Sequence, residues 1–114
     1  DRTPLPEIAP ALRDAQFVGI NCVGAPLLAQ HVRLLRAALE ADVLGAGAGP
    51  PIAAYGNVGH ADEHGAWVST DAVEPDRFAG YAMDWVDAGA TIIGGCCGTT
   101  PAIIAAIRQR LAAT

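Results

Sequence analysis

Three cysteines give this chain its strongest potential for chemistry. Cys96 and Cys97 are adjacent, and Cys22 lies far upstream of them, too distant for a zinc knuckle or ribbon. Cysteine thiolates are preferred ligands of Zn²⁺, and three of them leave one of the four tetrahedral positions open for a substrate, as in catalytic rather than structural zinc sites. Only the fold could bring Cys22 to the other two.

The residues around the cysteine pair predict the end of a strand followed by a helix. Residues 91–93 form a β-branched run that favours a buried strand, and the two glycines after them release the chain from strand geometry. Thr99 or Thr100 can accept a backbone N–H as helix cap, and the next proline pre-sets the first helical turn. The pair therefore lies beside a helix N-terminus, whose partial positive charge favours thiolate over thiol.

Hydrophobic periodicity predicts a first helix and then three strand–helix units, hence parallel strands with helical crossovers. The first helix covers residues 4–15, and strands are expected over residues 17–20, 52–55 and 91–93. The side chains expected on the buried faces of the three later helices are Leu28, Val32, Leu35 and Leu39, then Phe78, Ala82, Trp85 and Gly89, then Ile103, Ile104, Ile107 and Leu111.

Residues 56–74 are expected to form a polar loop, longer than a connection requires and therefore a candidate for building the site. The loop carries Asn57 directly after a predicted strand. It also carries His60 and His64, which are either further metal ligands or ordinary loop residues. Trp67 is expected to pack rather than to serve as a binding platform.

In a parallel sheet, ligands gather at the C-terminal ends of the strands. Cys22, Asn57 and the Cys96–Cys97 pair each follow a predicted strand end, so they are expected on one rim. Three thiolates from two strands would there surround one zinc ion. The other interpretations of the cysteines are small buried residues at strand ends and, without zinc, a vicinal Cys96–Cys97 disulfide.

The composition of the chain argues against several classes of function. The chain has 114 residues, a formal net charge of −5 and no lysine, which argues against a nucleic-acid partner. It is 52% hydrophobic, but no apolar run is long enough to cross a membrane and no basic-then-apolar leader is visible, so neither a membrane span nor a secretory signal is expected. Three cysteines do not make a disulfide framework and indicate a reducing compartment, the cytoplasm.

Four groups of residues, spread over nearly the whole chain from Phe17 onward, carry a resemblance to a known family, and the two groups that contain cysteines are a specific signature when they occur together. The four groups are Gly19-Ile-Asn-Cys22 with Pro26, Tyr55-Gly-Asn-Val-Gly59, Trp85 with Gly89, and Gly94-Gly-Cys-Cys-Gly-Thr-Thr-Pro101. In these groups the chain resembles the homocysteine S-methyltransferases, a family that includes the betaine-dependent enzyme and the homocysteine module of cobalamin-dependent methionine synthase. The chain departs from that pattern at Gly56, where members commonly have proline, and at His60, where they commonly have an acidic residue.

The resemblance implies a (β/α)₈ barrel in which Cys22, Cys96 and Cys97 bind zinc. Zinc in turn binds the homocysteine sulfur as a thiolate, which takes a methyl group from a small-molecule donor and becomes methionine. The implied substrate-binding residues are Asn21, Asn57 and Gly95. The donor is left open between S-methylmethionine, S-adenosylmethionine, betaine and methylfolate, because its site should lie on strands outside this sequence.

A closed barrel needs eight strand–helix units, typically about 250 residues, and this chain supplies about three. By resemblance, residues 1–114 are a partial homocysteine-binding domain, one helix plus the last three units. With two open sheet edges the chain is expected to pair with another copy or a complementing barrel half, and to be inactive without it. Two other functions stay open, a non-catalytic assembly module and an anion-binding fragment in which Gly94, Gly95, Gly98 and Thr99 cradle a phosphate.

Overall fold

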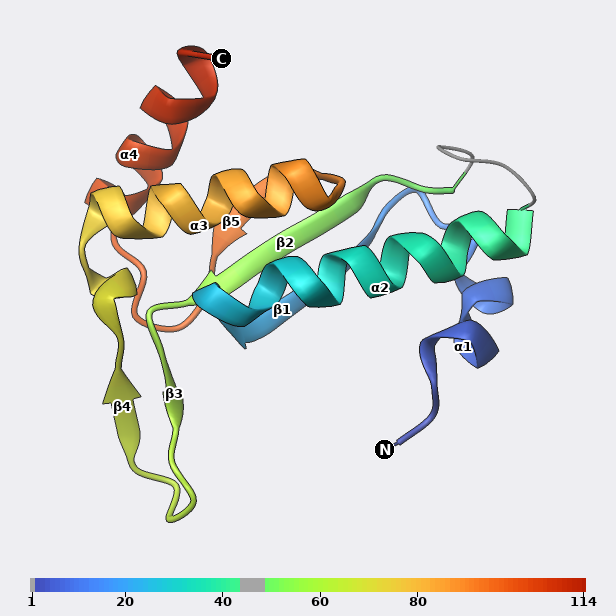
Figure 1. Ribbon diagram of the computed structural model, residues 1–114, viewed down its shortest axis with the longest axis horizontal. Helices are drawn as coiled ribbons and strands as arrows, with labels where there is room; N and C mark the ends of the chain where they lie inside the picture. The colour runs from blue at the N-terminus through green and yellow to red at the C-terminus, as the bar shows by residue number, and fades with distance from the viewer. Residues whose placement is uncertain (1, 44–48) are drawn as a thin grey trace.

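The computed structural model describes residues 2–43 and 49–114 as an α/β fold around a parallel three-stranded sheet (Figure 1). The sheet contains β1 (Val18–Gly24), β2 (Ile52–Asn57) and β5 (Ala90–Gly95), with β2 in the middle. The helices are α1 (Leu5–Leu12), α2 (Ala25–Val43), α3 (Pro75–Ala88) and α4 (Pro101–Ala112). The predicted parallel pairing is confirmed for both neighbours of β2. None of the helices in the described ranges is long and apolar enough to span a membrane.

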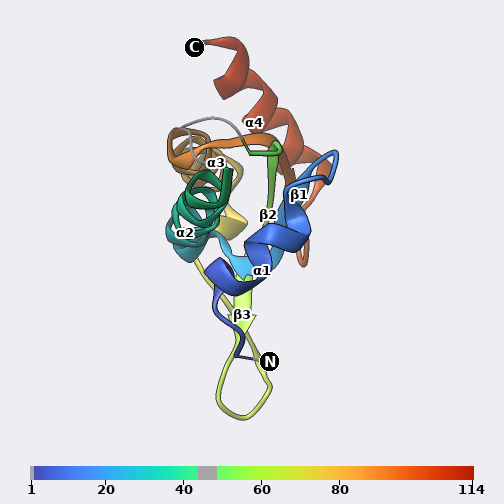
Figure 2. The same ribbon diagram turned by 90° about the vertical axis from the view of Figure 1, so that its right-hand side faces the viewer.

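Helices α2 and α3 lie side by side against one face of the sheet, as Figure 1 and the end-on view in Figure 2 show. The predicted apolar stripe of α2 fills this layer, and its members are at most 3% exposed: Leu28, Val32, Leu35 and Leu39. Helix α1 packs on α2, and α4 packs on α3. The hydrophobic core therefore lies between the sheet and the α2–α3 pair.

The opposite face of the sheet is open in the part of the chain that the structure describes. Phe17, Asn21 and Tyr55 are exposed there along a shallow hollow that Gly19 and Ala53 also line. Strands β1 and β5 are both edge strands. Free strand edges and contiguous apolar patches are often covered by another helix, loop or chain.

The prediction of a polar loop over residues 56–74 is wrong, because this segment contains secondary structure of its own. An antiparallel hairpin pairs β3 (Gly59–Ala61) with β4 (Trp67–Ser69), and the 3₁₀ turn η1 (Asp71–Val73) leads into α3. Strands of three residues are too short to show the alternation of polar and apolar residues that reveals a strand in a sequence.

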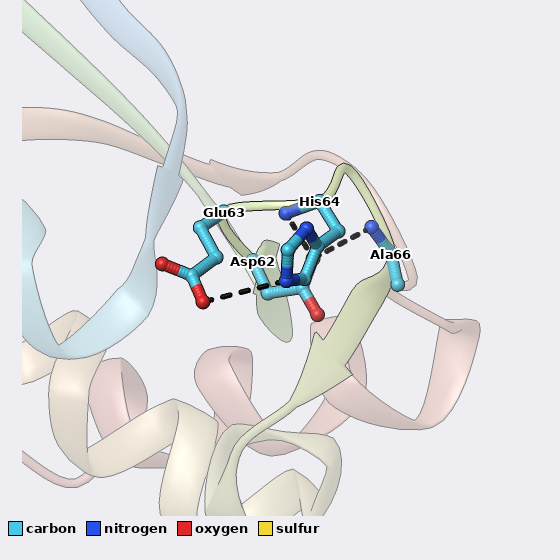
Figure 3. Close-up of polar contacts among 4 residues, drawn as sticks. All are labelled: Asp62, Glu63, His64 and Ala66. Atoms are coloured by element: carbon cyan, nitrogen blue, oxygen red, sulfur yellow. Dashed lines mark hydrogen bonds and ion pairs between the residues drawn. The ribbon is translucent and has the colours of Figure 1, made fainter.

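Asp62 closes the hairpin turn with both its backbone and its side chain: its N–H donates to Ala66 O at 2.7 Å, and its O accepts the Gly65 N–H at 3.0 Å. Asp62 Oδ1 accepts the N–H groups of His64 and Ala66, each at 2.9 Å (Figure 3). His64 Nε2 also lies 3.4 Å from Glu63 Oε1, and both side chains are exposed. Trp67 lies against the backbone at the start of the hairpin but stays 48% exposed, so it packs only in part.

Only two of the four residues predicted on the buried face of α4 are buried. Ile103 and Ile107 are buried together with Ala106, whereas Ile104 is 47% and Leu111 is 38% exposed. Because α4 packs mainly on α3, the fold covers one narrow stripe of this helix.

Trp85 joins the helical layer to the sheet. Its ring is fully buried, meets Phe78 edge-on with 5.4 Å between centroids, and donates its Nε1–H to Ala25 O at 3.1 Å. Gly56 in β2 lies against this ring, and a Cβ added there would come within 2.7 Å of it. Glycine is therefore the residue that lets β2 and Trp85 pack together.

Gly56→Ala is expected to destabilise the protein by about 1–3 kcal/mol, because the new methyl group must displace the Trp85 ring from a packed core. Gly80→Ala is the matched control. Its added Cβ, inside α3, would meet only Arg110 Nη2 at 3.8 Å, and alanine favours a helix over glycine by about 1 kcal/mol. Urea unfolding followed by circular dichroism measures both, and equal midpoints would contradict the packing argument.

Candidate metal centre

The three cysteines meet at the C-terminal edge of the sheet. Cys22 comes from β1, Cys96 and Cys97 come from the turn after β5, and their Sγ atoms all lie within 4.8 Å of one another. Among the described residues this is the one group of three or more metal-ligating side chains, and His60 and His64 lie outside it. The predicted convergence of the sulfurs is confirmed, and their service as zinc ligands stays a prediction.

Cys22 lies inside a strand and not after its end, because β1 continues past the predicted limit at Ile20. The ladder with β2 shifts between Asn21 and Val23, which makes Cys22 the extra residue of a β-bulge. Its φ of 59° is the one positive φ of a non-glycine residue in the described chain. Such a left-handed backbone costs a residue with a Cβ about 1–2 kcal/mol. With this backbone conformation, the Cys22 Sγ lies 2.6 Å from the Cys96 Sγ.

The Cys96–Cys97 turn is fastened to the end of β2. Cys96 donates its N–H to Gly56 O at 2.9 Å, and Cys97 O accepts the Val58 N–H at 3.1 Å. Between these two bonds, Asn57 Oδ1 accepts the Cys97 N–H at 2.9 Å. Three consecutive residues at the end of one strand therefore hold two consecutive cysteines.

Two threonines close this turn and start α4. Thr99 Oγ1 donates to Cys96 O at 2.8 Å, and Gly98 turns the chain with a φ of 79°. Thr100 is the helix cap, because its Oγ1 accepts the Ile103 N–H at 3.3 Å. The sequence left the cap open between the two threonines, and it carried no signal for the bond from Thr99 to the cysteine turn.

The contact between the Cys22 and Cys96 thiols shifts their pKa values in opposite directions. The hydrogen bond to Cys96, followed by desolvation and by the charges of Cys96 and Cys97, raises the pKa of Cys22 to about 11. The same bond is the main cause that lowers the pKa of Cys96. Of these two thiols, Cys96 therefore has the lower pKa.

The donor set fits zinc. A Zn–S bond of about 2.3 Å and tetrahedral angles place ligand sulfurs about 3.8 Å apart. The Cys22 and Cys96 Sγ atoms, which are 2.6 Å apart, would have to separate to about this distance around a zinc ion, and all three sulfurs lie within 4.8 Å of one another. Soft thiolates select zinc over magnesium or calcium, and three of them leave one coordination position for a substrate.

Comparison with known proteins identifies the family. A sequence model described as homocysteine S-methyltransferase matches residues 3–111. The chain belongs to the homocysteine S-methyltransferase family.

Individual homocysteine S-methyltransferase relatives match through only part of their length. The selenocysteine Se-methyltransferase of Brassica oleracea var. italica is 36% identical over 106 residues, which are 91% of this chain and 28% of that protein. Homocysteine S-methyltransferase 3 of Arabidopsis thaliana is 29% identical over 107 residues, 92% of this chain and 28% of that protein. Homocysteine S-methyltransferase 2 of Arabidopsis thaliana is 41% identical over 63 residues, 54% of this chain and 19% of that protein. The chain thus spans less than a third of these relatives.

The three substrate-binding residues expected from the homocysteine S-methyltransferase signature lie in different environments. Asn21 is exposed on the open face of the sheet. Asn57 is 6% exposed and bonded to Cys97. Gly95 is covered by the Thr99 side chain, which occupies the space that a Cβ would need. Contact of these residues with a substrate stays a prediction.

Cys22→Gly is expected to be more stable than Cys22→Ala by about 1 kcal/mol, because both remove the thiol and only glycine adopts a positive φ without strain. Urea unfolding of the two metal-free variants measures the difference. Val23→Gly and Val23→Ala form the control pair at the next position, where φ is not positive and alanine should be the more stable residue. The same order at both positions would contradict the bulge.

Proposed function

We propose that this chain provides the zinc centre of a homocysteine S-methyltransferase, which moves a methyl group from a small-molecule donor to the thiol of homocysteine and forms methionine. The meeting of the Cys22, Cys96 and Cys97 Sγ atoms within 4.8 Å carries the proposal. Membership of the family supports the reaction class. The relatives' names cover homocysteine and selenocysteine, so the acceptor class is an amino-acid thiol or selenol.

Each part of the site has a task in this reaction. Bound zinc would supply the positive charge that keeps a homocysteine thiol, with a free pKa of about 8.5, deprotonated at neutral pH. Cys22 on its bulge and the Cys96–Cys97 turn would hold the metal. Cys22 and Cys97 are exposed, so a substrate can reach the cluster. Free, exposed thiols of this kind suit a reducing compartment such as the cytoplasm.

The same proposal makes these elements the last three strand–helix units of a (β/α)₈ barrel. Parallel strands, helices α2 and α3 on one face, and a site at the C-terminal strand ends agree with that architecture. The open sheet face and the edges of β1 and β5 are where further barrel strands, a complementing chain or a second copy would pack. Catalysis is therefore expected to need that complement.

The anion-binding alternative has less support from the geometry. A phosphate at the start of α4 would need free N–H groups, and three of those near this helix start, from Cys97, Thr99 and Ile103, already have acceptors within the protein. The Thr99 side chain also fills the space beside Gly95. A metal cluster uses the side chains of this turn and leaves its backbone bonds intact.

Protein purified without chelator is expected to contain about one zinc ion per chain, and Cys96→Ser to lose it, since a hydroxyl is not among the usual zinc ligands. His64→Gln is the control that keeps the metal, because His64 lies outside the cluster. Elemental analysis by mass spectrometry, with light scattering for the chain's oligomeric state, gives the stoichiometry. A zinc-free wild type, or full occupancy in Cys96→Ser, would contradict the proposed site.

Methyl transfer is best measured in a chimera in which this chain replaces the matching segment of the Brassica enzyme. The chimera is expected to form methionine from homocysteine with at least one of the four candidate donors, whereas this chain alone is expected to be inactive. Cys96→Ser in the chimera is the control and should remove activity while the protein stays folded. A folded, zinc-loaded chimera that uses none of the donors would instead support the assembly module.

A further inference from the structure

We infer that Asn57 is a positioning residue for the metal ligand Cys97 and acts through a backbone hydrogen bond instead of through the substrate. The inference rests on the proposed zinc centre and replaces the substrate contact expected for Asn57 from the sequence. It begins from one interaction, the bond of 2.9 Å from the Cys97 N–H to Asn57 Oδ1.

Burial makes this bond significant. Asn57 is 6% exposed, and among the residues that the structure describes it is the one polar side chain in the buried class. Moving an amide out of water is unfavourable unless it finds a hydrogen-bond partner. The partner here is the N–H of a residue whose side chain belongs to the metal cluster, so the burial of Asn57 and the geometry of the ligand turn depend on each other.

The position of Asn57 explains why a side chain is used. On either side of it, Gly56 O and Val58 N–H bond to Cys96 N–H and Cys97 O. The Cys97 N–H lies between these two groups, and the Asn57 side chain supplies its acceptor. The peptide that joins the two cysteines is thereby held at its nitrogen as well as at both ends of the turn, which fixes the direction in which the Cys97 side chain leaves the backbone.

A direct role with the substrate fits Asn57 poorly. Its carbonyl oxygen is engaged, and the side chain is almost inaccessible. Asn21, which lies on the open face of the sheet, has the exposure that a substrate contact requires. The substrate contact that the sequence predicts for both asparagines therefore fits Asn21, whereas Asn57 fits a positioning role.

Two substitutions in the full chain distinguish the effect of the hydrogen-bond acceptor of Asn57 from the effect of its size. Asn57→Leu keeps the approximate size and removes the acceptor, and Asn57→Asp keeps an acceptor oxygen in the same place. Asn57→Leu is expected to weaken zinc binding about 10–100-fold, the usual effect of losing a group that orients a ligand. Asn57→Asp is expected to bind zinc within a few-fold of wild type. Competition with a chromophoric chelator measures the affinities.

Two further readouts distinguish positioning from simple loss of stability. The sulfur-to-cobalt charge-transfer band of Co²⁺-loaded protein should weaken in Asn57→Leu and persist in Asn57→Asp. Amide exchange in the metal-free protein should show Cys97 N–H protected in wild type and in Asn57→Asp only. Urea unfolding of both metal-free variants measures the fraction of each that is folded. If the folded fraction of Asn57→Leu alone accounts for its loss of zinc affinity, the inference is overturned.

The remaining outcomes are also decisive. Equal zinc affinity and cobalt spectra in Asn57→Leu and wild type would overturn the inference and leave the zinc centre standing. Asn57→Asp as weak as Asn57→Leu would show that the acceptor is not what matters, and would overturn it too. A wild-type chain that binds neither zinc nor cobalt would overturn the proposed function and this inference together.

Discussion

Hydrogen bonds between the end of β2 and the turn after β5 hold the candidate metal centre in shape. Two adjacent cysteines on a turn rich in glycine would otherwise sample many orientations, and ordering them around a metal would cost conformational entropy at the moment of binding. The fold removes much of that cost in advance, because Gly56, Asn57 and Val58 fix the turn. The central place of β2 matters, since the same Gly56 pairs with Val23 of β1 and Gly95 of β5.

Cys22 reaches the site by a different physical route. It lies on an edge strand, and its thiol is aimed by a bulge with an unfavourable backbone conformation. The pairing of β1 with β2 on both sides of the bulge keeps that conformation in place. Cys22 is therefore positioned by a β-bulge, and Cys96 and Cys97 are positioned by a hydrogen-bonded turn. The parallel sheet brings all three cysteines to one edge.

The sequence predicts those parts of the fold that short-range patterns determine. The order of strand, turn and helix around Cys96 follows from β-branched residues, glycines and a threonine cap, and the buried stripe of α2 follows from helical spacing. The bulge at Cys22 depends on pairing with β2, which no local pattern reports. The sequence does not predict the β3–β4 hairpin, because strands of three residues are too short to show an alternating pattern. The sequence marks Asn57 as a residue at a strand end, but only packing decides that its amide faces Cys97.

Zinc K-edge X-ray absorption on the wild-type chain loaded with one equivalent of zinc tests the three-sulfur centre most directly. The spectrum is predicted to show three sulfur neighbours at about 2.3 Å and one lighter atom, with a fourth sulfur replacing that atom when homocysteine is added. A shell made mainly of nitrogen and oxygen, or one with fewer than three sulfurs, would contradict the joint ligation of zinc by Cys22, Cys96 and Cys97.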